Sequence, residues 1–298
     1  SQDNESAGAR YTQLQMNAQA AISAMELYEA FGETEYLSRG VSFARILMAC
    51  QASAVDPSFS IPLRGYFYEN ETHERIQTYY HRSYEHAPIK AFAMLYRLAP
   101  EHEDAARWKN SLELYREYVA LTSRTVPYGL LPNGIYELDN TDFSTITHEG
   151  ARAAGAPSLE EYNAQVRNGI RLNDRFYLRV FPVAYQFRGF HATLMGRALA
   201  AMELARALND REIKQVAVRQ MEWILGCNPF AVSSMYGEGH DYHPLYAPMS
   251  PQLVGAVPVG FETFENEDQP FYPMQNNATY KEVWVHTTCR MMWLIAML

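Results

Sequence analysis

The sequence is poor in cysteine, in basic residues and in long hydrophobic runs, and each shortage excludes a class of protein. Three cysteines, far apart and odd in number, form neither a disulfide framework nor a recognisable zinc site. The 25 lysines and arginines are outnumbered by 34 acidic residues and form no basic stripe, which argues against a nucleic-acid partner. Since no apolar run reaches the ~20 residues that span a bilayer, we also expect no membrane partner.

The chain begins without the charged and apolar segments of a signal peptide, so any such peptide has been removed or was never present. With 298 residues, 48% of them hydrophobic, the chain is long enough to bury a large core. Because disulfides are not expected, packing must supply the stability.

The most informative positive feature is an internal repeat. Residues 24–36 align with residues 201–213, and both stretches begin Ala-Met-Glu-Leu. Each copy has the apolar spacing of an amphipathic helix, then a turn at Gly32 or Asn209, then a second helical pattern. The repeat unit is therefore predicted to be a hairpin of two helices.

A looser third copy covers residues 87–121 with a break at Pro100, and a closing helix is expected from about residue 281 to residue 298. Repeated hairpins bury their apolar faces against their neighbours, so they either stack into a solenoid or close into an α/α toroid. This pattern predicts an all-α fold in a single domain over residues 1–298.

Three long tracts separate the helical patterns, at residues 56–80, 123–175 and 230–280. They are rich in Pro, Gly, Asn and aromatic residues, and loops of this length usually carry function. They favour a toroid with a loop-built active face over a peptide-binding solenoid. Any strands should be short and confined to these tracts.

Two segments near the C-terminus concentrate chemistry-bearing side chains. Residues 235–244 hold glycines, two histidines, two carboxylates and two tyrosines within ten positions. Glu282 lies where an irregular loop becomes the closing helix, which should put its carboxyl group at the rim of a toroid.

These segments resemble the C-terminal part of the glycoside hydrolase family 9 catalytic module. The resemblance consists of Leu-Gly-x-Asn-Pro-Phe at residues 225–230, the Gly- and His-rich loop, and Tyr-Lys-Glu-Val at residues 280–283, and it covers about residues 187–298. It implies an (α/α)6 six-hairpin barrel that hydrolyses β-linked glucans with inversion and needs no cofactor. The family's general-acid glutamate matches Glu282.

The chain departs from the family's pattern in two places. The family's His-His-Arg substrate cluster is replaced by a segment from His240 to Tyr246 without an arginine, so the substrate is not carried over. The family's Asp-x-Gly-Asp motif, which holds the catalytic base, is absent. About seven of twelve barrel helices are accounted for, so we expect an N-terminal companion segment or chain to complete the barrel. Within this chain, Asp241 and Glu149 are the first candidates for the base.

The expected sugar-binding residues come from the same loops. Aromatic rings can stack on sugar rings, and histidine and amide groups can bind hydroxyls. The predicted substrate-binding set is His240, His243, Tyr236, Tyr242, Tyr246, Trp284, Asn276 and His86. Some alternatives stay open: Asn276 could instead cap the last helix, and the two loop histidines could bind a metal, although no third ligand can be named and we expect none. Cys227 is interpreted as a small buried residue.

The sequence thus predicts a secreted or periplasmic glycosidase that degrades an oligosaccharide or polysaccharide. Glu282 should protonate the leaving oxygen, and burial should raise its pKa and place it at the floor of the cleft. A second carboxyl group is expected roughly 6.5–9.5 Å away. Two other classes remain: a non-catalytic carbohydrate-binding or scaffold protein without the base, and a uronate polysaccharide lyase or epimerase that uses Tyr and His.

Overall fold

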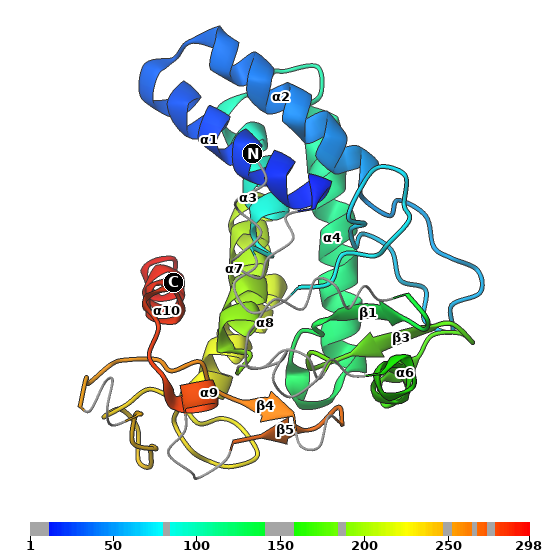
Figure 1. The fold of residues 1–298 in the computed structure, drawn as a ribbon. Coiled ribbons are helices and arrows are strands. Elements are labelled where there is room, and N and C mark those ends of the chain that lie inside the picture. The colour runs from blue at the N-terminus through cyan, green and yellow to red at the C-terminus, as the bar shows by residue number, and fades with distance from the viewer. Residues whose placement is uncertain are drawn as a thin grey trace.

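The computed structural model describes residues 12–79, 84–140, 158–183, 189–246, 252–263, 267–272 and 278–298. The described residues are mainly helical, with short strands in the connections (Figure 1). The α-helices are α1 (Gln13–Phe31), α2 (Thr34–Ala49), α3 (Ala87–Leu98), α4 (Ala105–Thr125), α6 (Leu159–Arg167), α7 (His191–Leu208), α8 (Arg211–Ile224), α9 (Ala278–Lys281) and α10 (Val285–Ala296). The prediction of a helical chain is confirmed at this level.

The repeat seen in the sequence corresponds to two helical hairpins with the same kind of turn. Gly32 ends α1 in the left-handed conformation with φ 71°, and Asn209 ends α7 in the same way with φ 53°. Glycine and asparagine tolerate this conformation better than other residues, so both helices stop at the predicted positions. Asp210 then begins α8 by accepting hydrogen bonds from the backbone N–H groups of Glu212 and Ile213.

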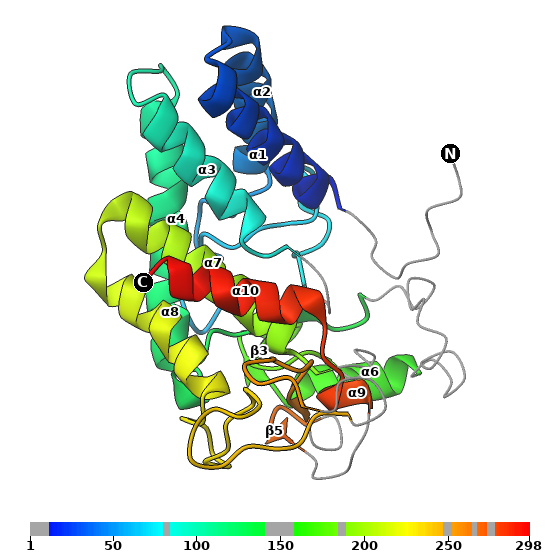
Figure 2. The same ribbon diagram turned by 90° about the vertical axis from the view of Figure 1, so that its left-hand side faces the viewer.

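The helices lie in two layers. Helices α1, α3, α7 and α10 follow one another in a first layer, each in contact with the next, and α2, α4 and α8 lie behind them. In Figure 2, α10 runs from right to left, and the N-terminal ends of α1 and α3 also lie to the right. The N-terminal ends of these three first-layer helices therefore lie on the same side of the molecule. This arrangement fits an arc of helical hairpins, and its closure into a six-hairpin toroid stays a prediction.

The core lies between the two layers. Helix α7 is buried along most of its length because α3, α4, α8 and α10 all pack on it. Its many alanines let these neighbours approach closely. Trp108 of α4 and Trp223 of α8 are among the largest fully buried side chains. None of the described helices combines the length and apolar character needed to cross a membrane.

The strands are short, as expected. Strands β1 (Gly134–Glu137), β2 (Ile170–Arg171) and β3 (Phe176–Arg179) form an antiparallel sheet in the order β1-β3-β2, and β4 (Glu262–Thr263) pairs with β5 (Pro270–Phe271). Strand β3 falls just beyond the tract 123–175, so the predicted boundary of that tract is wrong by a few residues. A short 3-10 helix, η2 (Pro127–Gly129), follows α4.

Helix α6 is a further correction, since the tract 123–175 was predicted to be irregular. Ser158 accepts a hydrogen bond from the backbone N–H of Glu161, and the Glu161 side chain accepts one from the N–H of Ser158. This capping box is visible in the sequence as Ser-x-x-Glu and predicts a helix start.

Candidate functional site

Glu282 lies in an extended segment between α9 and α10. Its carbonyl oxygen accepts a hydrogen bond of 2.9 Å from the backbone N–H of Val259, and the next residue, Val283, forms a β-bridge with Pro258. This pairing keeps residues 282–284 extended, so the closing helix begins at Val285 and not near residue 281. Glu282 therefore precedes the first turn of the helix.

The Glu282 side chain is held by its neighbour Trp284. The indole Nε1–H of Trp284 donates a hydrogen bond of 2.6 Å to Oε2 of Glu282. The Glu282 side chain is half-buried, whereas the sequence predicted a largely buried one. Glu282 lies in the short segment that leads into α10, outside the packed helices. The hydrogen bond fixes the orientation of a carboxyl group that remains partly open to solvent.

The loop 235–246 reaches this region at its C-terminal end. The backbone N–H of Tyr246 donates a hydrogen bond of 3.1 Å to the carbonyl of Lys281, the residue before Glu282. Tyr246 and His243 are half-buried, and the His243 ring meets Tyr272 edge-on at 4.8 Å between centroids. The structure thus brings Tyr246, His243 and Glu282 into one neighbourhood.

The charge environment of His243 links it to the same segment. Burial and the positive charge of Lys281 lower the pKa of His243, while Asp241 opposes the shift. Lys281 is itself fully buried, and burial lowers the pKa of its ammonium group. His243 is therefore favoured in its neutral form, which can both donate and accept a hydrogen bond.

The middle of the loop is more exposed. His240, Asp241 and Tyr242 are exposed to solvent, and Tyr236 is half-buried. The rings of Tyr236 and Tyr242 pack edge-to-face with 5.2 Å between centroids. These two tyrosines form an aromatic pair in the loop, and their role in stacking on a sugar stays a prediction.

His86 is another of the residues predicted from the sequence to bind substrate. It immediately precedes α3, is buried, and packs its ring edge-on against Trp293 of α10 at 5.0 Å. Burial lowers its pKa to about 3, so the ring is neutral near pH 7. Substrate binding by His86 remains a prediction.

Other predicted positions fall outside the described part of the chain. Asn276 and Glu149 are among them, so neither has a structural account. Within the described residues, no group of three or more His, Cys, Asp or Glu side chains could hold a metal ion. Cys227 is exposed, so its interpretation as a buried residue is wrong; it follows the end of α8, where the chain leaves the core.

A buried charged cluster lies beside His86, and its burial was not predicted from the sequence. Glu85 is 3% exposed and lies against Gly196, while Arg197 of α7 and Arg290 of α10 are also buried. Neither carboxylate oxygen of Glu85 forms a hydrogen bond of normal length and angle with a described residue. Burial raises the pKa of Glu85 to about 8, although the positive charges of Arg197 and Arg290 oppose the shift. In the sequence, Glu85 is only one member of a polar segment, residues 81–86, that precedes a helix. Its burial results from three helices meeting, which the local sequence does not record.

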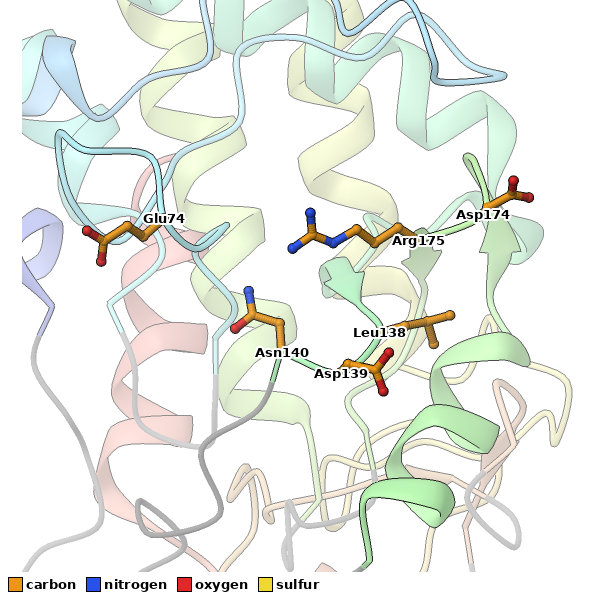
Figure 3. Close-up of a pocket in the computed structure, with 6 residues that line it drawn as sticks. All are labelled: Glu74, Leu138, Asp139, Asn140, Asp174 and Arg175. Atoms are coloured by element: carbon orange, nitrogen blue, oxygen red, sulfur yellow. The ribbon is translucent and has the colours of Figure 1, made fainter.

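An open cavity of about 710 Å³ lies beside the three-stranded sheet (Figure 3). Arg175 extends toward its middle, and Asp174 points away from it. Arg175 is paired with the buried carboxylate of Glu137. The lining residues are Glu74, Leu138, Asp139, Asn140, Asp174 and Arg175. None of the predicted site residues within the described part of the chain lines this cavity.

The chain is similar at a coarse level to structures of glycoside hydrolase family 9 cellulases. The structure titled "Bacteroides ovatus GH9" matches with a TM-score of 0.48 and 12% identity, over 95% of this chain and 40% of that one. Endoglucanase CelQ from Clostridium thermocellum, in complex with cellobiose and cellotriose, matches with a TM-score of 0.37 and 16% identity, over 95% and 47%. Cellulase Cel9M of C. cellulolyticum matches with a TM-score of 0.32 and 14% identity, over 96% and 84%.

The chain thus spans less than half the length of the first two structures. No protein-family model matches the sequence, and the search of curated proteins gave no significant match.

Proposed function

We propose that this chain belongs to a glycoside hydrolase that cleaves β-linked glucans or related oligosaccharides with inversion, and that Glu282 is the general acid. The observation that carries the proposal is the oriented carboxyl group of Glu282, held at 2.6 Å by the Trp284 indole directly before α10. A general acid must be fixed relative to the bond it protonates. A packed neighbouring side chain fixes its orientation before the reaction begins.

The surrounding groups suit a sugar ligand. Neutral His243 and the backbone-anchored Tyr246 lie beside the Glu282 segment, and the Tyr236–Tyr242 pair belongs to the same loop. Sugars are bound by hydroxyl-directed hydrogen bonds together with stacking on aromatic faces. The substrate class itself is taken from the sequence resemblance. A polymeric substrate would be met outside the cytoplasm, so the proposal includes secretion or a periplasmic location.

The proposal also includes a companion segment that supplies the catalytic base. Asp241, one candidate base within the chain, is exposed on its loop. Among the described helices, α10 makes extensive contact with α7 alone. Apolar side chains are exposed along α10 and just after its end: Val285, Met292, Ile295 and Leu298. In stacked hairpin folds such a face is normally covered by the next repeat, so a companion of the same kind would cover α10 and bring the second carboxylate.

The test is hydrolysis of β-glucan oligosaccharides by the wild type, Glu282→Gln and a surface control, Glu222→Gln, each with and without a companion that supplies further helical hairpins. We expect turnover with the companion only, inverted stereochemistry of the product, and a loss of at least about 100-fold in Glu282→Gln with sugar binding retained. The Glu222→Gln control should match the wild type. Wild-type turnover by Glu282→Gln would contradict the assignment.

The same assay separates the alternatives. Sugar binding without turnover under every condition would favour a non-catalytic carbohydrate-binding protein. Formation of unsaturated sugars from uronate polymers would favour a lyase.

A further inference from the structure

A short extended segment is hydrogen-bonded both to the start of α7 and to the backbone of Glu282. In this segment, residues 257–261, Val259 accepts a hydrogen bond of 3.0 Å from the backbone N–H of His191 and donates one of 2.9 Å to the carbonyl of Glu282. Gly260 donates one of 2.8 Å to the carbonyl of Tyr280. The segment therefore lies between the N-terminus of α7 and the strand-like residues that carry Glu282.

The imidazole ring of His191 fixes this segment from the α7 side. Its Nδ1 lies 3.0 Å from the carbonyl oxygen of Pro258. A carbonyl can only accept a hydrogen bond, so Nδ1 carries the proton and Nε2 does not. The ring is fully buried, and burial lowers its pKa to about 4, so this neutral tautomer persists near pH 7.

The ring also has a fixed place in the packing. A Cβ atom on Gly260 would lie 2.1–2.2 Å from atoms of the His191 ring, so the ring rests directly on the Gly260 backbone. Phe261 meets the ring edge-on at 5.2 Å between centroids. Since Gly260 also has φ 93°, a side chain there would be strained as well as crowded.

We propose that His191 is a positioning residue for Glu282, which it holds through the Pro258 carbonyl and the backbone of Val259. The Nδ1–H group fixes the Pro258 carbonyl, the adjacent Val259 N–H fixes the Glu282 carbonyl, and Trp284 fixes the Glu282 side chain. His191 itself contacts no substrate in this scheme. The catalytic consequence rests on the proposed function, whereas the structural coupling does not.

The coupling can be measured without any enzyme activity. The chain has four tryptophans, and the Trp284 indole N–H resonance in a ¹⁵N-tryptophan spectrum reports its hydrogen bond to Glu282. Trp284→Phe assigns the resonance, and Glu282→Gln shows how it responds when the carboxylate is lost. The indole resonances of Trp108 and Trp293, far from this segment in sequence, report whether the fold is intact.

Two matched amide substitutions test the role of Nδ1. Asn at position 191 can place an N–H group where Nδ1–H lies, whereas Gln reaches the Nε2 position, which has no partner among the described residues. We expect His191→Asn to keep the Trp284 resonance near its wild-type position. His191→Gln should move that resonance toward its position in Glu282→Gln, with Trp108 and Trp293 unchanged.

An unchanged Trp284 resonance in folded His191→Gln, or equal shifts in both variants, would overturn the proposal. If His191→Gln does not fold, His191→Phe, which keeps a ring but lacks the donor, replaces it with the same expected shift. Where hydrolysis is detected, the Gln variant should lower kcat about 10-fold or more with little change in KM. Complete absence of hydrolysis would count against the proposed function alone, since the resonance still decides the coupling.

Discussion

Replacing Glu85 with glutamine should stabilise the protein at alkaline pH and leave its stability unchanged in acid. In the native structure, burial raises the pKa of Glu85 from an ordinary value of 4.5 to about 8. The native state therefore keeps the proton between these values, and the unfolded chain releases it. Stability falls with rising pH wherever the native state binds more protons than the unfolded state.

The size of the effect follows from the same pKa values. Each pH unit across this interval removes about 1.4 kcal/mol of unfolding free energy, so ionised Glu85 lowers stability by on the order of 5 kcal/mol above pH 8. This figure is an upper bound for the gain in Glu85→Gln, because Arg197 and Arg290 remain buried and lose a nearby negative charge. Below about pH 4.5 the carboxyl group is protonated in both states, and the variant should match the wild type.

The assay is urea denaturation between pH 4 and pH 9.5, with Glu113→Gln on the exposed side of α4 as the control. The free-energy difference between Glu85→Gln and the wild type should grow with pH and level off above about pH 8, and the control should show no such growth. A variant that is less stable than the wild type at pH 9 would show that Glu85 is ionised and stabilised by its arginines. Parallel pH profiles would likewise refute the reasoning.

Three further outcomes are expected. Gly196→Ala should destabilise the protein by about 1–3 kcal/mol in urea denaturation, because its Cβ would lie 2.7 Å from Oε2 of Glu85 inside a packed core. Asp210→Ala should lower the unfolding free energy by roughly 1–2 kcal/mol, because the first turn of α8 loses both hydrogen bonds to its capping side chain. Asp210→Asn should recover much of the loss. In a thiol titration of the native protein, two cysteines should react at once and Cys50 on unfolding only, because burial raises its pKa to about 12. Three fast-reacting thiols would show that the α2 end is open in solution.

The local structure of the helical hairpins was accessible from the sequence. Gly32 and Asn209 stop their helices through backbone conformations that depend on the residue itself, and the apolar spacing sets which helix faces are buried. The capping box at Ser158 was equally local, so α6 could have been predicted with the same reasoning. The Leu-Gly-x-Asn-Pro-Phe and Tyr-Lys-Glu-Val motifs, which are also runs of contiguous residues, marked the C-terminal loops as the candidate site.

The tertiary structure decided what those loops contact. Residues 282–284 are extended because this part of the chain pairs with residues 257–261. That pairing makes the last helix begin at Val285, and Glu282 is left half-buried beside Trp284. Glu85 is buried where helices distant in the sequence meet, and the His191 ring is covered by the extended segment 257–261. Their shifted pKa values therefore follow from desolvation that no local pattern records. Spacing along the chain specifies turns, caps and helix faces, whereas the environment of a buried polar group depends on which segments pack around it.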